Sequence, residues 1–155
     1  MTLFKPEVMD FVSIMAVCCG FALWRGRAPE RIVAVAVLVA WAASGLLHTR
    51  DFTRPQYGMF WVDLVLLALL IALATRTGRR WLMIASAFHV LTVGDHFAMM
   101  LDMRIKSYAY QTVMVIWGYA VLLAMVLGTW FEAEPERRRL RAGPAGPNGS
   151  PASSE

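Results

Sequence analysis

The chain has 155 residues, of which 58% are hydrophobic and 17% are charged. An ordinary soluble domain has about 45–50% apolar and about 25% charged residues, so this composition excludes a disordered chain, a collagen-like chain and a disulfide scaffold. The net charge of +4 comes from basic residues that lie between apolar blocks, which argues against a nucleic-acid-binding face. Because the apolar blocks exceed what a core of this size could bury, the composition predicts a polytopic membrane protein.

Five apolar blocks approach the length of about 20 residues that a helix needs to cross a bilayer. In chain order they are residues 8–24, 32–47, 57–74, 81–101 and 108–131. The connections between the blocks are too short to form a domain outside the membrane. The sequence therefore predicts an all-α integral membrane protein in which residues 1–131 form a bundle of five transmembrane helices.

The first block does not resemble a cleavable signal peptide. The basic Lys5 that precedes it is offset by Glu7 and Asp10. We therefore expect this block to remain as an anchor. The adjacent Cys18 and Cys19 lie within the apolar run, where they cannot link distant segments and are expected to be small core residues.

The fourth block is the least apolar of the five. Its eight strongly apolar residues contribute roughly −2.4 to −4.8 kcal/mol to insertion, whereas one central aspartate costs about 2.5 to 3.5 kcal/mol. With Asp95, His89 and His96 in the block, insertion of this helix alone is about neutral. It is expected to cross only if its polar face meets neighbouring helices. The alternative is four crossings and a re-entrant fourth segment around Gly94.

The residues after the fifth block differ in character from the rest of the chain. Residues 132–141 are rich in charge, and the remainder to residue 155 is rich in Gly, Pro, Ser and Ala. We expect residues 132–155 to form a cytoplasmic tail that is first charged and then disordered.

Basic residues in the short connections predict the orientation. Ten of them fall on one side of the predicted membrane: Arg25, Arg27, Arg31, Arg76, Arg79, Arg80, Arg137, Arg138, Arg139 and Arg141. Five fall on the other: Lys5, Arg50, Arg54, Arg104 and Lys106. This bias predicts an outer N-terminus and a cytoplasmic C-terminus. Tyr57, Trp81 and Tyr110 at block ends are typical of the aromatic belts at the membrane interfaces.

Several polar side chains are expected at one depth in the outer part of the bundle. With a rise of about 1.5 Å per residue, Asp63 and Asp95 each lie about 9 Å below the outer face. His48 ends the second block near that face, and His96 follows Asp95. On the fourth helix His89 and His96 share one stripe, while Asp95 lies about 100° away, so Asp95 and His96 cannot both point at one neighbour.

These residues allow more than one reading. His48, Asp63, Asp95 and His96 are metal-ligand types, and His48 and His96 are the only well-placed pair for a b-type haem. The reading favoured here is an intramembrane polar network of Asp63, His89, Asp95 and His96, in which Asp63 hydrogen-bonds His96, a Thr or a Tyr. We therefore expect no bound cofactor.

Small residues at helical spacing allow close helix packing. They occur at Ala36, Ala40 and Ser44, at Ala68 and Ala72, and at Ala120, Ala124 and Gly128. Packing within the bundle is the favoured explanation, and contact with a membrane-protein partner or a second copy is the alternative. Besides such a partner we expect only the lipid bilayer, and no nucleic acid.

From the third block onward the chain resembles a group of small, uncharacterised bacterial inner-membrane proteins. The residues that carry the resemblance are Pro55-Gln56-Tyr57-Gly58, Asp63, Ala87-Phe88, His96, Tyr108-Ala109-Tyr110 and Ile116-Trp117, within residues 55–128. The resemblance implies a multi-pass protein of the bacterial cytoplasmic membrane and no particular activity.

The sequence shows none of the common catalytic motifs, such as G-x-S-x-G, a P-loop, H-E-x-x-H or C-x-x-C. We therefore expect a non-enzymatic accessory or interaction component of the membrane. The alternative is a transporter of protons or metal ions, or a redox subunit with haem b, that uses the outer layer of Asp and His side chains.

Overall fold

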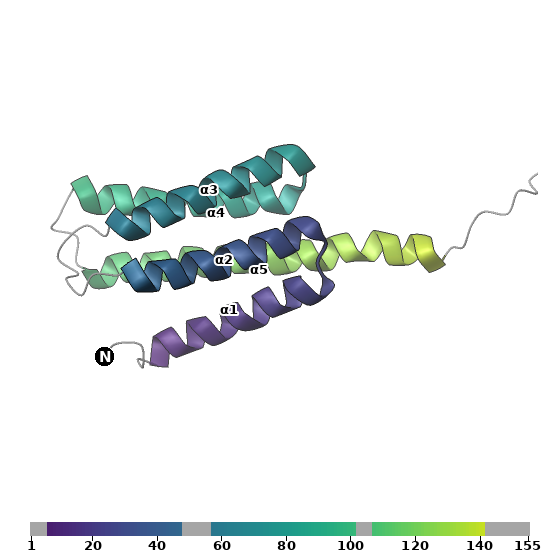
Figure 1. Cartoon of the computed structure of the whole chain (residues 1–155), viewed down its shortest axis with the longest axis horizontal. Helices are drawn as coiled ribbons and strands as arrows, with labels where there is room; N and C mark the ends of the chain where they lie inside the picture. The colour runs from purple at the N-terminus through teal and green to yellow at the C-terminus, as the bar shows by residue number, and fades with distance from the viewer. Residues whose placement is uncertain (1–5, 48–56, 102–106, 142–155) are drawn as a thin grey trace, which may run out of the picture.

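The computed structural model describes residues 6–47, 57–101 and 107–141, with side chains placed for residues 9–47, 57–101 and 110–131. These ranges form five helices: α1 (Pro6–Arg25), α2 (Ala28–Leu47), α3 (Tyr57–Thr77), α4 (Arg80–Leu101) and α5 (Ser107–Arg141). Figure 1 shows them side by side, with successive helices running in opposite directions and α5 extending beyond the others. The described part of the chain is thus entirely helical, as the sequence predicts.

Four of the helices have the length and apolar composition needed to cross a membrane. They are α2, α3, α4 and residues Tyr110–Phe131 of α5. The predicted block 8–24 lies within α1, and its crossing stays a prediction. The two largest differences from the predicted blocks are that α2 begins at Ala28 rather than at residue 32 and that α5 continues to Arg141 rather than ending at residue 131.

The two differences have physical reasons. Proline and an acidic residue in the first turn favour a helix start, and Pro29 and Glu30 supply both, so α2 begins before its apolar block. Residues 132–141 are mostly Glu, Arg, Ala and Leu, which are strong helix formers, so charge ends the apolar block without ending the helix.

Two short turns lie at the same end of the bundle (Figure 1). Gly26 and Arg27 connect α1 to α2, and Gly78 and Arg79 connect α3 to α4. Gly78 has a φ of 65°, and its N–H donates to the carbonyl of Ala74 at 2.9 Å. This left-handed residue closes the end of α3, a position that glycine occupies without steric cost.

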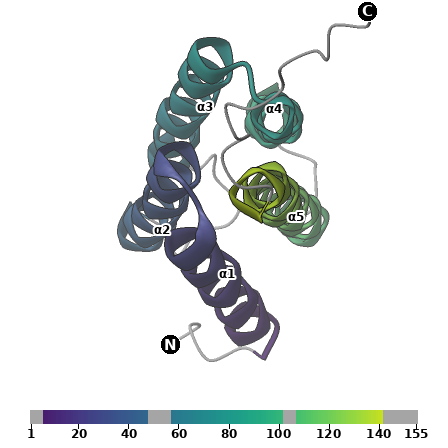
Figure 2. The same cartoon turned by 90° about the vertical axis from the view of Figure 1, so that its right-hand side faces the viewer.

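The helices form a closed ring in the order α1, α2, α3, α4, α5, with α5 returning to α1. Figure 2 shows this arrangement along the bundle, with α4 and α5 next to each other. The contact between α4 and α5 is the most extensive, and α2 touches α5 only over a small area across the ring. α4 is one uninterrupted helix from Arg80 to Leu101 and passes through Gly94.

The apolar core fills the half of the bundle nearest the two turns. All five helices contribute to it, with Met15, Cys19, Ala22, Val33, Ala34, Leu66, Leu70, Ala74, Trp81, Leu82, Ala85, Val121, Leu122, Ala124 and Met125. The other half of the bundle contains the buried histidines. Cys19 is thus a core residue, as expected. The apolar core and the buried histidines lie at different positions along the bundle axis.

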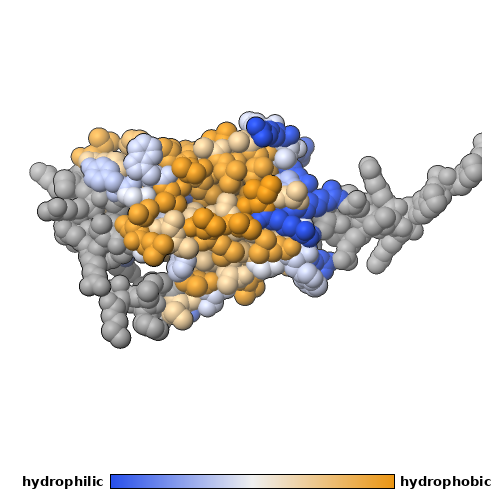
Figure 3. Space-filling model, viewed as in Figure 1, coloured by the Kyte–Doolittle hydropathy of each residue, from blue (hydrophilic) through white to orange (hydrophobic). Residues whose placement is uncertain are grey.

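The face turned to the viewer in Figure 3 has an apolar middle and hydrophilic residues at the end with the two turns. Exposed arginines of this end are Arg27, Arg31, Arg76 and Arg80. Large apolar side chains such as Val65, Leu91 and Leu123 are exposed along the middle. An apolar surface of this kind suits a lipid environment, as the four long apolar helices also indicate.

Gly128 allows α5 to approach Trp81 on α4. A Cβ added at Gly128 would lie 2.2 Å from Trp81 Cγ, whereas one added at Gly94 would meet no atom within 4 Å. Replacing Gly128 with alanine is therefore expected to lower the free energy of unfolding by about 1–3 kcal/mol, because the buried indole of Trp81 would have to shift.

Gly94→Ala is the matched control for this prediction. Since alanine is the better helix former, this variant is expected to raise the free energy of unfolding by up to about 1 kcal/mol. Detergent-induced unfolding followed by circular dichroism measures both effects. Equal changes in the two variants would contradict the close approach at Gly128.

Candidate functional site

A cluster of polar side chains joins α3, α4 and α5 in the half of the bundle away from the turns. Asp63 comes from the second turn of α3, His89 and His96 from α4, and Tyr110 from the first turn of α5. His89, His96 and Tyr110 are buried, and Asp63 is mostly so. Asp63 and His96 are two of the side chains that the sequence predicts at one depth, whereas His89 lies two helical turns before His96 on α4.

His96 is the centre of the cluster, with 1% of its surface exposed. Its Nε2 lies 2.9 Å from Asp63 Oδ2, and its Nδ1 lies 2.8 Å from the Tyr110 hydroxyl oxygen. The carboxylate only accepts, so Nε2–H donates to Asp63, and in the neutral ring Nδ1 accepts from the Tyr110 hydroxyl. The hydrogen bond predicted between Asp63 and His96 is present, and it links α3 to α4.

His89 adds a second contact between α4 and α3. Its Nε2 lies 3.1 Å from the backbone carbonyl oxygen of Asp63 and 3.8 Å from Asp63 Oδ1. The ring N–H therefore donates to the carbonyl, which can accept a second hydrogen bond besides that of its own helix. His89 and His96 of α4 therefore both form hydrogen bonds with Asp63 of α3.

Aromatic rings enclose His96. The ring centroid of Phe60 lies 5.9 Å away in an edge-on arrangement, and that of Tyr110 lies 5.7 Å away. Phe60 also packs edge-on against Phe97, at 5.2 Å. Such an apolar enclosure strengthens the hydrogen bonds inside it and raises the cost of breaking them.

Asp95 is separate from this cluster. Its carboxylate interacts with the indole of Trp117 on α5. Three of the four residues of the expected network, Asp63, His89 and His96, therefore meet, and Asp95 faces a different neighbour. The helical spacing predicts this separation of Asp95 from His96.

The hydrogen bonds of His96 oppose metal binding by its ring. Both of its ring nitrogens already have partners, so the ring has no free nitrogen to bind a metal ion or haem iron. Within the described ranges, no three His, Cys, Asp or Glu side chains are grouped so as to hold a metal ion. His48, the other member of the haem pair considered from the sequence, lies outside the described residues.

Tyr110 is a site residue that sequence reasoning placed elsewhere. Its position at the start of an apolar block predicts a ring in the interfacial belt, whereas the structure buries it against His96 to 7% exposure. The sequence does contain a pattern that predicts burial. Tyr110, Trp117 and Val121 are seven and four residues apart, so they lie on one face of α5, and that face packs against the bundle.

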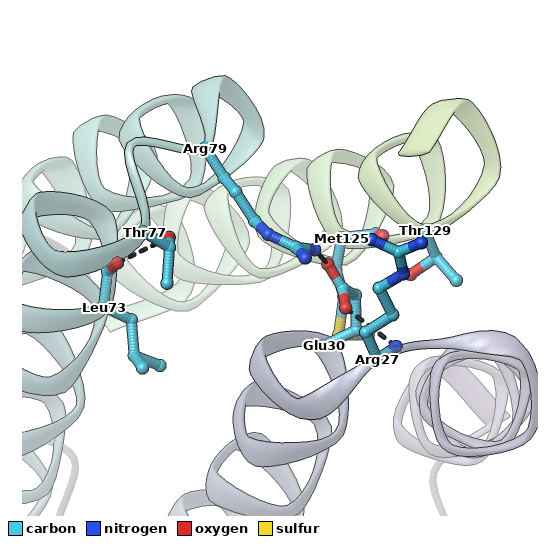
Figure 4. Close-up of polar contacts among 7 residues, drawn as sticks. All are labelled: Arg27, Glu30, Leu73, Thr77, Arg79, Met125 and Thr129. Atoms are coloured by element: carbon cyan, nitrogen blue, oxygen red, sulfur yellow. Dashed lines mark hydrogen bonds and ion pairs between the residues drawn. The ribbon is translucent and has the colours of Figure 1, made fainter. Parts of the chain in front are cut away.

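A second polar contact, which the sequence did not predict, joins the two turns. Glu30 is 1% exposed, and its Oε1 forms an ion pair with Arg79 Nη1. Its Oε2 accepts from the backbone N–H of Arg27 at 2.9 Å, which caps the start of α2. Figure 4 shows Arg79 reaching from the turn between α3 and α4 to Glu30 on α2. The contact ties the first pair of helices to the second.

Comparison with known proteins adds no relative. The chain matches no protein-family model, no curated protein and no solved structure with which it was compared.

Proposed function

We propose that this chain is a non-enzymatic accessory component of the bacterial cytoplasmic membrane, with five crossings, an outer N-terminus and a cytoplasmic C-terminus. In this role the polar cluster holds the helices in register and the outer surface meets lipid and a protein partner. The observation that carries the proposal is that Asp63, His96 and Tyr110 satisfy one another, one from each of three helices. A polar group so engaged inside a membrane specifies helix positions.

The topology has support from charge and from the helices. The turns that join α1 to α2 and α3 to α4 lie at one end of the bundle, and arginines gather there. By the positive-inside rule this end faces the cytoplasm. The continuity of α4 through Gly94 supports a full crossing over a re-entrant segment. The resemblance of residues 55–128 to inner-membrane proteins supports the location.

The small residues indicate where a partner would pack. Ala36 and Ala40 pack against the core and Gly128 is buried, so these positions serve the bundle itself. Ala68 and Ala72 on α3 are exposed instead. Because small residues let helices approach closely, the outer face of α3 is the surface we assign to a helix of another protein or of a second copy.

A second candidate function, proton transfer, is favoured by the continuity of the polar cluster. Hydrogen bonds connect Tyr110 to His96 and His96 to Asp63, while His89 bonds the carbonyl of Asp63. A chain of groups that donate and accept can pass protons inside a membrane. If the protein transfers protons, Asp63 and His96 perform this transfer in addition to fixing the positions of the helices.

Reconstitution of the purified protein in liposomes separates the two candidates. With a membrane potential imposed and a pH-sensitive dye inside, an accessory protein is expected to give the same proton flux as empty liposomes. A flux that depends on the protein and disappears in Asp63→Asn would overturn the accessory role.

Two further readouts come from the same preparation. The purified protein is expected to show no haem absorption, because both nitrogens of His96 are engaged. A cysteine in place of Ala68 is expected to cross-link to a partner helix in native membranes, whereas one in place of Ala34, which is fully buried, is not. Cross-linking at neither position would leave α3 facing only lipid and would contradict the surface assigned to a partner.

A further inference from the structure

Arginines surround the end of the bundle at which the two turns lie. Four of them come from four neighbouring helices: Arg25 from the last turn of α1, Arg31 from the start of α2, Arg76 from the last turn of α3 and Arg80 from the start of α4. The last three are exposed, and Arg25 is partly so. We refer to these four residues as the arginine rim. In Figure 3 the hydrophilic side chains of this end border the apolar middle of the surface.

The acidic side chain of this end does not neutralise the arginine rim. Among the described side chains of this end, Glu30 is the only acidic one, and it is buried and paired with Arg79, which is not part of the rim. The continuation of α5 over residues 132–141 adds three glutamates and four arginines, so it leaves this end basic. The rim is therefore a positively charged surface that favours an anionic partner.

The indole of Trp24 marks the boundary between the apolar and the polar surface beside Arg25. Trp24 is 76% exposed, and the guanidinium carbon of Arg25 lies 5.6 Å from the centroid of its ring. Exposed tryptophans are typical of the level at which lipid headgroups begin. A guanidinium that contacts a ring face keeps N–H donors for another partner. On α5, the exposed Trp130 stacks on Phe21 of α1, so both helices carry an exposed indole at this end.

Other arginines of the rim also adjoin exposed apolar side chains. Ile32 follows Arg31 on α2, and Met83 lies in the first turn of α4 after Arg80, and both apolar side chains are exposed. An anion that meets these arginines beside hydrocarbon is the headgroup of a lipid, because its chains cover the apolar surface next to it. A soluble anion would gain nothing from that surface.

We propose that the arginine rim binds the phosphate groups of anionic phospholipids such as phosphatidylglycerol. A planar guanidinium presents paired N–H donors that fit two oxygens of one phosphate. A phospholipid without net charge has a cationic group beside its phosphate, so it gains less from the rim. The proposal rests on the membrane location of the proposed function and adds the class of lipid to it. It holds for either orientation of the chain in the membrane.

Spin-labelled lipids measure this preference. The purified full-length protein is reconstituted in phosphatidylcholine vesicles, and electron paramagnetic resonance gives the fraction of labelled lipid that the protein immobilises. Labelled phosphatidylglycerol is expected to be immobilised more than labelled phosphatidylcholine, with an association constant up to about fivefold higher where a headgroup meets one arginine. High salt should reduce this difference, because it screens exposed charges.

Two variants that lose the same number of positive charges locate the effect. The rim variant combines Arg25→Gln, Arg31→Gln, Arg76→Gln and Arg80→Gln. The control variant combines Arg50→Gln, Arg54→Gln, Arg104→Gln and Lys106→Gln, at positions outside the described residues. The rim variant should immobilise the two lipids equally and keep its helical circular dichroism, since none of its four arginines is buried. The control variant should keep the preference for phosphatidylglycerol.

Three results would overturn the proposal. Equal immobilisation of the two lipids by the wild-type protein would leave the rim to an acidic segment of a protein partner. A preference that survives in the rim variant would place the lipid elsewhere, and an equal loss in both variants would show an effect of total charge alone. Failure of the proposed membrane location gives a different result, because neither lipid would then be immobilised.

Discussion

Replacing Arg79 with alanine is expected to lower the free energy of unfolding by about 3–5 kcal/mol, the range for removing one member of a buried ion pair. The loss is large because Glu30 is 1% exposed and would remain without its counter-charge. Arg79 itself is 17% exposed, so its own desolvation contributes less. The N–H of Arg27 still bonds Glu30 in this variant, but a neutral donor stabilises a carboxylate less than a guanidinium does.

Arg76 supplies the matched control for this prediction. It is an exposed arginine in the last turn of α3, and Arg76→Ala is expected to change the free energy of unfolding by less than about 0.5 kcal/mol. The double variant Glu30→Gln, Arg79→Met should recover part of the loss, since both charges are then absent. Detergent-induced unfolding measures all three variants. Equal losses for Arg79→Ala and Arg76→Ala would show that the ion pair contributes nothing.

Replacing His96 with alanine is expected to lower the free energy of unfolding by about 3 kcal/mol or more. The change leaves a cavity at a fully enclosed position and removes the partner of two groups, Asp63 Oδ2 and the Tyr110 hydroxyl. Tyr110→Phe removes only one hydroxyl and leaves Nδ1 of His96 unsatisfied, so a loss of about 1–3 kcal/mol is expected.

A double-variant cycle tests whether these residues act together. Asp63→Asn and His96→Ala are expected to be non-additive by about 0.5–3 kcal/mol, the usual range for residues in contact. Leu91→Ala, at an exposed position of α4, is the control for loss of side-chain volume and should cost much less. Additive losses at Asp63 and His96 would contradict a shared network.

The sequence predicts the helices well because apolar length is a local property. Each of the five predicted blocks lies inside one helix, and the helix ends that differ depend on capping and charge rather than on hydrophobicity. The pairing of Asp63 with His96 is also predictable, since equal depth on neighbouring helices leaves few other partners. The separation of Asp95 from His96 follows from helical spacing alone.

Other features depend on information that a local pattern lacks. Tyr110 has a ring that suits either an interface or a core, and only the packing of α5 on α4 decides between them. Glu30 and Arg79 are 49 residues apart, so no spacing rule links them. Arg79 also counts among the basic residues that predict the orientation, and that role gives no indication of its ion pair with Glu30.

The distance along the chain between these two partners has a consequence for biogenesis. Arg79 is 49 residues after Glu30, and at a synthesis rate of about 5–20 residues per second this stretch takes about 2–10 seconds to produce. Throughout that interval Glu30 is part of the growing chain and Arg79 has not yet been made. The ion pair that ties the first helical hairpin to the second can therefore form only after the turn between α3 and α4 has been made.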